Sequence, residues 1–114
     1  MSNRSAVRRP LDGIVAIETS SFLTGPFAAM MLADLGADAI KVEPPGGDGF
    51  RKFGPNCGGY GASWTNASRS KRSIVIDLKT EPGIHRLKRL IARADVLIEN
   101  WRRFTNAKKP AVAR

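Results

Sequence analysis

Four short runs of apolar residues have the length of a β-strand: residues 14–18, 39–43, 73–78 and 95–99. The first run is almost continuously apolar, which is typical of a strand in a sheet that is covered on both faces. Stretches with helical features lie after the first and third runs. The predicted order is therefore strand, helix, strand, a long connection, strand, helix and strand.

The first helix is predicted to begin at Thr24 and to end at Gly36. The Thr24 hydroxyl can cap the first turn, and Pro26 lies where a missing N–H costs nothing. Residues 27–35 are apolar except for Asp34, so we expect this helix to be covered on more than one side. Gly36 suits the left-handed conformation that commonly follows a helix.

The second helix is predicted to begin after Thr80, where a capping hydroxyl precedes Glu81 and Pro82. Helical spacing then puts Ile84, Leu87, Leu90 and Ile91 on one apolar face, and a basic set of Arg86, Lys88, Arg89 and Arg93 falls largely outside that face. This division predicts an amphipathic helix at the surface.

Residues 44–72 are rich in Gly and Pro and have no sustained period, which predicts a long loop that is either functional or disordered. Tyr60 and Trp64 indicate that part of this loop packs against the domain. Lys71 and Arg72 fit either a phosphate site or a solvated pair of charges, and we favour the solvated pair.

Short strands that alternate with helices predict an α/β domain with a Rossmann-like, mostly parallel sheet. Right-handed crossovers would bring the carboxyl ends of all strands to one edge. We expect this segment to span residues 10–102, with a basic tail at residues 1–9 and another at residues 103–114.

The net charge of +9 comes largely from the two tails, because residues 10–101 carry 11 Lys and Arg against 10 Asp and Glu. Nucleic-acid binding is therefore only weakly supported. Cys57 is the single cysteine and His85 the single histidine, which predicts neither a disulfide nor a metal site. We expect a cytoplasmic protein without a membrane span.

Ligands of open α/β sheets bind outside the carboxyl ends of the strands. Here those ends offer a helix N-terminus, Lys79 and Arg102 for an anionic group, the Asn100 amide and the Trp101 indole. This set predicts a nucleotide or coenzyme site. The sequence contains neither of the common glycine-rich phosphate-binding motifs.

Four stretches of the chain resemble the N-terminal part of class III coenzyme A transferases, the CaiB/BaiF-like family that includes 2-methylacyl-CoA racemases: PLDGIVAIE, LTGPFAAMMLADLGADAIKVEPPGGD, SKRSIVIDLKTEPG and ADVLIENWR. In that family the CoA thioester binds at the strand ends. The resemblance implies that CoA or acyl-CoA is bound by Leu23, Thr24, Pro44, Ile76, Asp77, Leu78, Lys79, Asn100, Trp101 and Arg102.

The sequence departs from the family pattern at three places. Some transferases have a Gln at the position of Leu23 and an Arg at that of Pro44, so those side-chain contacts do not carry over. After Arg102 the family's Pro-Gly turn and Leu-rich helix are absent, and we expect the resemblance to stop there. The family's catalytic Asp follows well beyond this point, so no catalytic residue is assigned in this chain.

The resemblance implies an acyl-CoA-binding segment that is truncated and inactive alone, from an enzyme that moves CoA between carboxylic acids or racemises acyl-CoA. Its substrates would be acyl-CoA and carboxylic acids, without a metal, and its full-length relatives form homodimers. The alternative is a small basic protein that binds nucleic acid through its tails and the basic set of the second helix, without enzymatic activity.

Overall fold

The computed structural model describes residues 7–101 of the chain. Residues 1–6 and 102–114 lie outside the described part, and with them most of the two predicted tails and Arg102. Within the described part no helix is long and apolar enough to cross a membrane.

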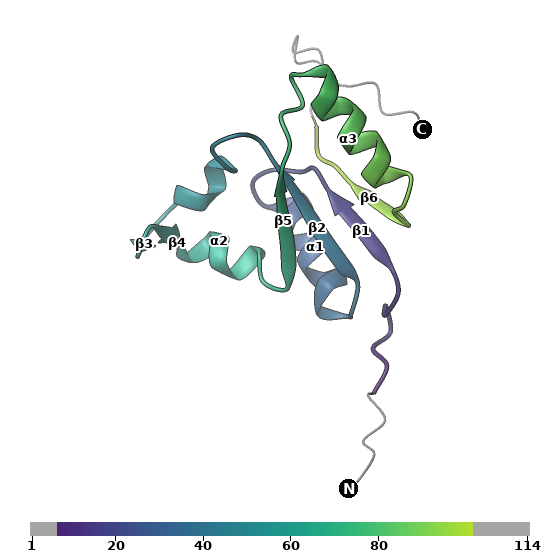
Figure 1. The fold of residues 1–114 in the computed structure, drawn as a ribbon. Helices are drawn as coiled ribbons and strands as arrows, with labels where there is room; N and C mark the ends of the chain where they lie inside the picture. The colour runs from purple at the N-terminus through teal and green to yellow at the C-terminus, as the bar shows by residue number, and fades with distance from the viewer. Residues whose placement is uncertain (1–6, 102–114) are drawn as a thin grey trace, which may run out of the picture.

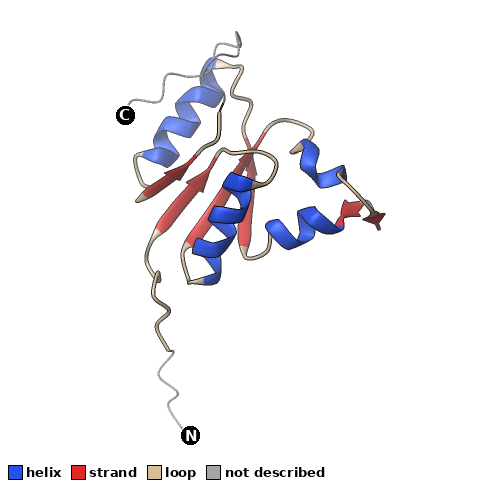
Figure 2. Cartoon of the chain, turned by 180° about the vertical axis from the view of Figure 1, so that it is seen from behind, coloured by secondary structure: helices blue, strands red, loops and turns tan. Residues whose placement is uncertain are grey.

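A four-stranded parallel sheet forms the centre of the domain (Figure 1). Its strands are β1 (Val15–Glu18), β2 (Asp38–Glu43), β5 (Lys71–Val75) and β6 (Val96–Ile98), in the order β5-β2-β1-β6. Helix α1 (Thr24–Asp34) packs on one face of the sheet, and α3 (Glu81–Ile91) packs on the other (Figure 2). The predicted α/β class and mostly parallel sheet are confirmed.

The two faces of the sheet have different cores. On the α3 side, Ile17 of β1 and Val42 of β2 pack with Leu87 of α3, which is 1% exposed. On the α1 side most of the buried apolar residues are small, with Ala16 and Ala39 in the strands and Ala29 and Ala33 in the helix, and Met30 is the large one. Small side chains allow the helix to approach the sheet closely.

The observed helix α1 differs from the predicted one in two respects. Leu23 is the N-cap residue, and no side chain caps this helix, so the predicted capping by Thr24 is wrong. The helix is also covered on one side only, because Phe27 and Met31 are 48% and 50% exposed. The predicted end is confirmed, since Gly36 has a φ of 111°.

Helix α3 begins as predicted. The hydroxyl of Thr80 accepts a hydrogen bond from the Gly83 N–H at 3.1 Å. Strand β5, in contrast, begins at Lys71 and ends at Val75, two residues earlier than expected at its start. Its five residues pair in register with Ala39–Glu43, and residues 76–78 therefore lie in the connection that follows the strand.

The predicted loop between β2 and β5 contains regular structure, which corrects the expectation of a long irregular connection. It holds a 3-10 helix η1 (Gly49–Lys52), a hairpin of β3 (Asn56–Cys57) and β4 (Tyr60–Gly61), and helix α2 (Ala62–Ala67). Phe50, Trp64 and Ala67 form a second small core there. The prediction that Trp64 packs against the domain is confirmed, whereas Tyr60 is 55% exposed.

Candidate ligand-binding site at the strand ends

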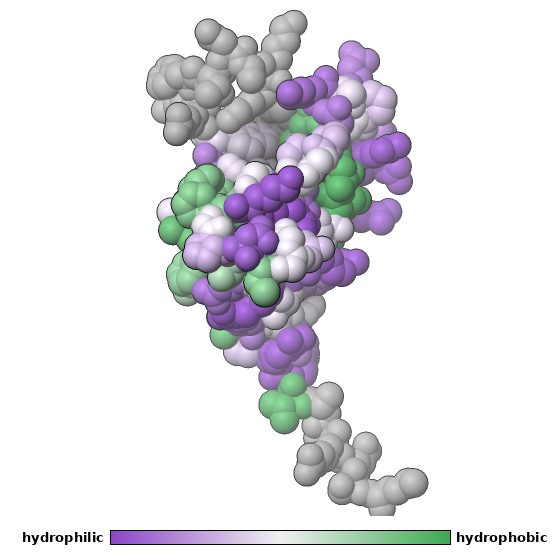
Figure 3. All heavy atoms as spheres, turned by 90° about the vertical axis from the view of Figure 1, so that its left-hand side faces the viewer, coloured by the Kyte–Doolittle hydropathy of each residue, from purple (hydrophilic) through white to green (hydrophobic). Residues whose placement is uncertain are grey.

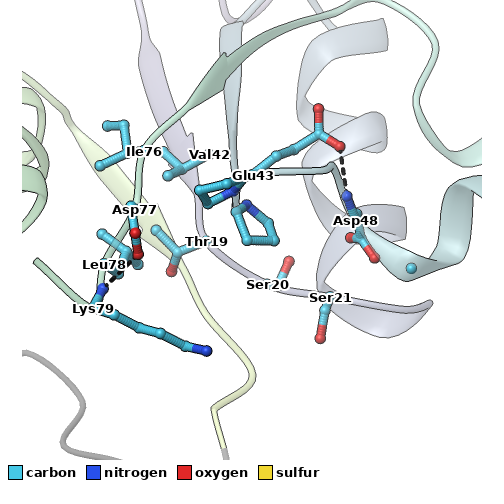
Figure 4. A pocket seen from close by; sticks show the side chains of 13 residues that line it. Thr19, Ser20, Ser21, Val42, Glu43, Asp48, Ile76, Asp77, Leu78 and Lys79 are labelled. Atoms are coloured by element: carbon cyan, nitrogen blue, oxygen red, sulfur yellow. Dashed lines mark hydrogen bonds between the residues drawn. The ribbon is translucent and has the colours of Figure 1, made fainter.

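A pocket of about 470 Å³ lies at the carboxyl ends of β1, β2 and β5 (Figure 4). Three segments contribute to its wall: the end of β1 and the loop after it, the β2–η1 connection and the residues that follow β5. The lining residues are Thr19, Ser20, Ser21, Val42, Glu43, Pro44, Pro45, Asp48, Gly49, Ile76, Asp77, Leu78 and Lys79. Pro44 and residues 76–79, half of the binding residues predicted from the sequence, lie together in this wall.

Asn100 and Trp101 do not line the pocket, but they contact residues that do. The Asn100 side chain accepts a hydrogen bond from the Ser21 N–H at 3.0 Å and donates one to the Ser21 carbonyl at 2.7 Å. The Trp101 indole N–H donates to the Thr19 carbonyl at 3.0 Å. The segment after β6 therefore holds the loop after β1 in place, which is a positioning role that the sequence did not indicate.

The remaining predicted residues lie elsewhere. Leu23 and Thr24 are exposed at the start of α1 and do not line the pocket. Arg102 falls outside the described residues. The structure thus brings part of the predicted set into one cavity. Two further members, Asn100 and Trp101, form hydrogen bonds to residues of the cavity wall.

The connection after β5 is fixed by its own hydrogen bonds. Asp77 accepts a hydrogen bond from the Lys79 N–H through its carboxylate at 3.0 Å, and its carbonyl accepts one from the Thr80 hydroxyl at 2.9 Å. Gly83 lies against this connection so closely that an added Cβ would be 1.8 Å from the Asp77 carbonyl oxygen. The Lys79 side chain is exposed and forms no ion pair within residues 7–101, so its charge is available to a ligand (Figure 4).

Thr19 contributes a buried hydroxyl to the pocket. The residue is 8% exposed, and its Oγ1 has no hydrogen-bond partner among the described residues. A buried polar group without a partner costs about 1–3 kcal/mol. A ligand whose polar group forms a hydrogen bond to this hydroxyl would remove that cost.

A buried charge network connects three strands beneath the pocket. Lys41 Nζ lies 2.7 Å from Glu18 Oε1 and 3.1 Å from Asp48 Oδ2, and Lys71 Nζ lies 2.7 Å from Glu18 Oε2. The side chains of Glu18 and Lys41 are 0% and 2% exposed.

The interpretation of Lys71 and Arg72 as a solvated pair is therefore wrong for Lys71. Burial lowers the pKa of Lys71, while Glu18 opposes that effect. Arg72 pairs with Asp38 at the surface.

Glu43 anchors the β2–η1 connection that forms one wall of the pocket. Arg51 binds both of its carboxylate oxygens at 2.7 Å, Ser73 donates a hydrogen bond to it, and the Asp48 N–H donates another at 3.0 Å. Burial raises the pKa of Glu43, but these hydrogen bonds outweigh it and lower the pKa to about 2. The Arg51 guanidinium also stacks on Trp64, 4.4 Å from the ring centre.

The pocket is suited to binding more than to covalent chemistry. Val42, Pro44 and Leu78 give it apolar walls, and Thr19 and Lys79 supply a hydroxyl and a cation. Its carboxylates, Glu43, Asp48 and Asp77, are all engaged by neighbouring groups. Within residues 7–101 no group of His, Cys, Asp and Glu could hold a metal ion.

The sequence profile of CoA-transferase family III matches residues 11–109, which extends past Arg102, where we expected the resemblance to stop. The chain is 47% identical to succinate–glutarate CoA-transferase of Agrobacterium fabrum, over 95% of this chain and 28% of the relative. It is 46% identical to succinyl-CoA–D-citramalate CoA-transferase of Chloroflexus aurantiacus, over 82% of this chain and 24% of the relative.

Solved structures of similar proteins also match this chain. A CaiB/BaiF family protein from Brucella suis superposes with a TM-score of 0.77 at 44% identity, over 82% of this chain and 26% of that protein. The hypothetical protein Rv3272 from Mycobacterium tuberculosis superposes with a TM-score of 0.76 at 36% identity, over 83% and 26%. The chain spans about a quarter of the length of these relatives. With this agreement of sequence and fold, the chain belongs to CoA-transferase family III.

Proposed function

We propose that these residues form the acyl-CoA-binding segment of a CoA-transferase. The observation that carries the proposal is the pocket at the strand ends, which combines apolar walls with the Lys79 cation and the unpartnered Thr19 hydroxyl. The phosphates of CoA would pair with Lys79, and the thin pantetheine arm would lie against Pro44 and Leu78. The Thr19 hydroxyl would bond to one of its amides.

The names of the relatives support the substrate class. They transfer CoA between carboxylic acids such as succinate and glutarate, or from succinyl-CoA to D-citramalate. We therefore propose CoA thioesters of short dicarboxylic acids as ligands and a carboxylic acid as the acceptor. Racemisation is the weaker proposal, because it needs an acid and a base on opposite sides of one carbon, and the only histidine, His85, lies exposed on α3 outside the pocket lining.

The 114 residues by themselves bind the thioester without turning it over. Transfer between carboxylic acids through an enzyme anhydride requires a free carboxylate that attacks the thioester carbonyl and releases the CoA thiolate. Glu43 and Asp48 are held by cations, and the Asp77 carboxylate accepts a hydrogen bond from the backbone. None of the three is presented as a nucleophile. The nucleic-acid alternative has no support from the relatives, which are CoA-transferases.

A titration of the 114-residue chain with CoA and with succinyl-CoA, followed by calorimetry, tests the proposed site. Lys79→Glu should weaken binding about tenfold or more, because it replaces a cation with an anion beside the phosphates. Lys88→Glu is the matched control, since Lys88 is exposed on α3 and does not line the pocket. Equal binding by the wild type and by Lys79→Glu would exclude this site.

A further inference from the structure

A groove runs between strand β5 and helix α3, on the face of the sheet that α3 covers. It consists of two adjoining hollows of about 210 and 460 Å³, which share Ile74, Leu90 and Arg93. Ile74, Ile76 and Leu90 form an apolar floor. In Figure 3, green apolar surface at the upper right, on the α3 side, is bordered by purple hydrophilic side chains.

The rim of the groove carries unpaired positive charge. Arg86 and Arg89 of α3 and Arg93, which follows the helix, line the smaller hollow, and none forms an ion pair within residues 7–101. Arg72, in the larger hollow, is already neutralised by Asp38. These arginines are three of the four residues of the basic set. They do not line the pocket at the strand ends, so the acyl-CoA binding proposed there does not involve them.

Strand β5 also forms one edge of the described sheet. It pairs with β2 alone among the described strands, and Ile74 and Val75 are 39% and 58% exposed. The outer edge of such a strand carries backbone N–H and C=O groups that can pair with an added strand. An added strand would direct alternate side chains toward the groove floor.

We propose that this groove binds an extended acidic polypeptide segment, which pairs with the edge of β5. Those of its side chains that point to the α3 face alternate between apolar ones, which pack on Ile74 and Leu90, and acidic ones, which pair with Arg89 and Arg93. Charge complementarity selects this occupant, because the groove joins cations that are unpaired within residues 7–101 to an apolar floor, beside a strand edge that none of those residues covers.

Other occupants fit the groove less well. Single-stranded nucleic acid needs aromatic side chains on which its bases stack, and no residue lining either hollow is aromatic. A lipid surface is flat, whereas this site is concave. A second copy of the chain would bring few free carboxylates, because most of those in residues 7–101 are already bound by cations or backbone N–H groups.

Fluorescence anisotropy tests the proposal with the whole chain and a labelled short peptide of the repeat Leu-Thr-Glu-Thr, in which the Leu and Glu side chains share one face of an extended strand. The double variant Arg89→Glu/Arg93→Glu should weaken binding of this peptide about tenfold or more. Lys88→Glu lies on the same helix outside the groove and should change it less than about twofold. Circular dichroism of each variant checks that the helix content is retained.

Altered peptides separate the contributions to binding. Replacing Leu by Ser, or methylating alternate backbone nitrogens, should each weaken binding about tenfold, since one removes the apolar contacts and the other the strand donors. Equal weakening by Lys88→Glu and by the double variant would overturn the proposal. So would an undiminished affinity of the methylated peptide, or tighter binding of oligouridylate or of phosphatidylserine vesicles through the same arginines.

Discussion

Thr19 is buried beside the pocket with a hydroxyl that makes no hydrogen bond to residues 7–101. Thr19→Val removes this hydroxyl at almost constant shape. We expect the free energy of unfolding to stay the same or rise by up to about 1 kcal/mol, and the affinity for CoA to fall about fivefold to tenfold. Urea denaturation and calorimetry measure the two effects.

Thr19→Ser is the control for this prediction, because it keeps a hydroxyl at the same position. It should retain most of the affinity for CoA. If Thr19→Val instead lowers the free energy of unfolding by more than about 1 kcal/mol, the hydroxyl has a stabilising partner in the protein and is not reserved for a ligand.

Lys41 is the centre of the buried charge network. Lys41→Met leaves Asp48 without its cation and Glu18 with Lys71 as its remaining cation. Removing one partner from a buried ion pair costs about 3–5 kcal/mol, and we expect the free energy of unfolding to fall by that amount. Arg72→Met should have little effect, since its ion pair with Asp38 is exposed. Similar destabilisation by both variants in urea would contradict the burial of the network.

The β2–η1 connection predicts how the free energy of unfolding depends on pH. Folding lowers the pKa of Glu43 from 4.5 to about 2, so its contribution to stability is complete above pH 4.5. As the pH falls from 4.5 toward 2, the unfolded chain binds the proton first and the free energy of unfolding decreases. Urea denaturation at a series of acidic pH values measures this slope. Glu43→Gln should make the slope shallower, and an unchanged slope in that variant would show that Glu43 is not responsible.

At the element scale, sequence patterns located the elements with clear signals. The strands β1, β2 and β6 follow apolar runs, and α3 follows an apolar face with the Thr80 cap. The structure within residues 44–70 was missed because two-residue strands and a helix of six residues are too short to show a period. Tyr60 and Trp64 were the local signs that this segment packs, and only Trp64 is buried.

The buried network was missed for a different reason. Glu18, Lys41 and Lys71 lie on one face of neighbouring strands, but each is an isolated polar residue when it is seen alone. Their pairing joins residues 23 and 53 positions apart, and it depends on strand order, which local patterns do not fix. The residues at the strand ends were predicted to lie together because the carboxyl ends of parallel strands meet at one edge of the sheet. This part of the site could therefore be predicted from the expected topology.

For the whole molecule, we expect no CoA transfer and no epimerisation of 2-methylacyl-CoA by the purified 114-residue chain. Binding orients the thioester but leaves the chemical step almost uncatalysed when no free carboxylate can attack. Assays on protein shown to be free of host enzymes measure this. Turnover that disappears in Asp77→Asn would contradict the expectation, because it would identify Asp77 as a nucleophile within the chain.

The sheet order has a consequence for synthesis on the ribosome. Of the described strands of this sheet, β1 is made first but lies between β2 and β6, and β6 is made last. One edge of β1 therefore stays unpaired until residue 98 has left the exit tunnel. Exposed apolar strand edges in partly made chains invite aggregation and recruit chaperones. Ribosomes that stall between residues 80 and 95 would hold a nascent chain in that open state.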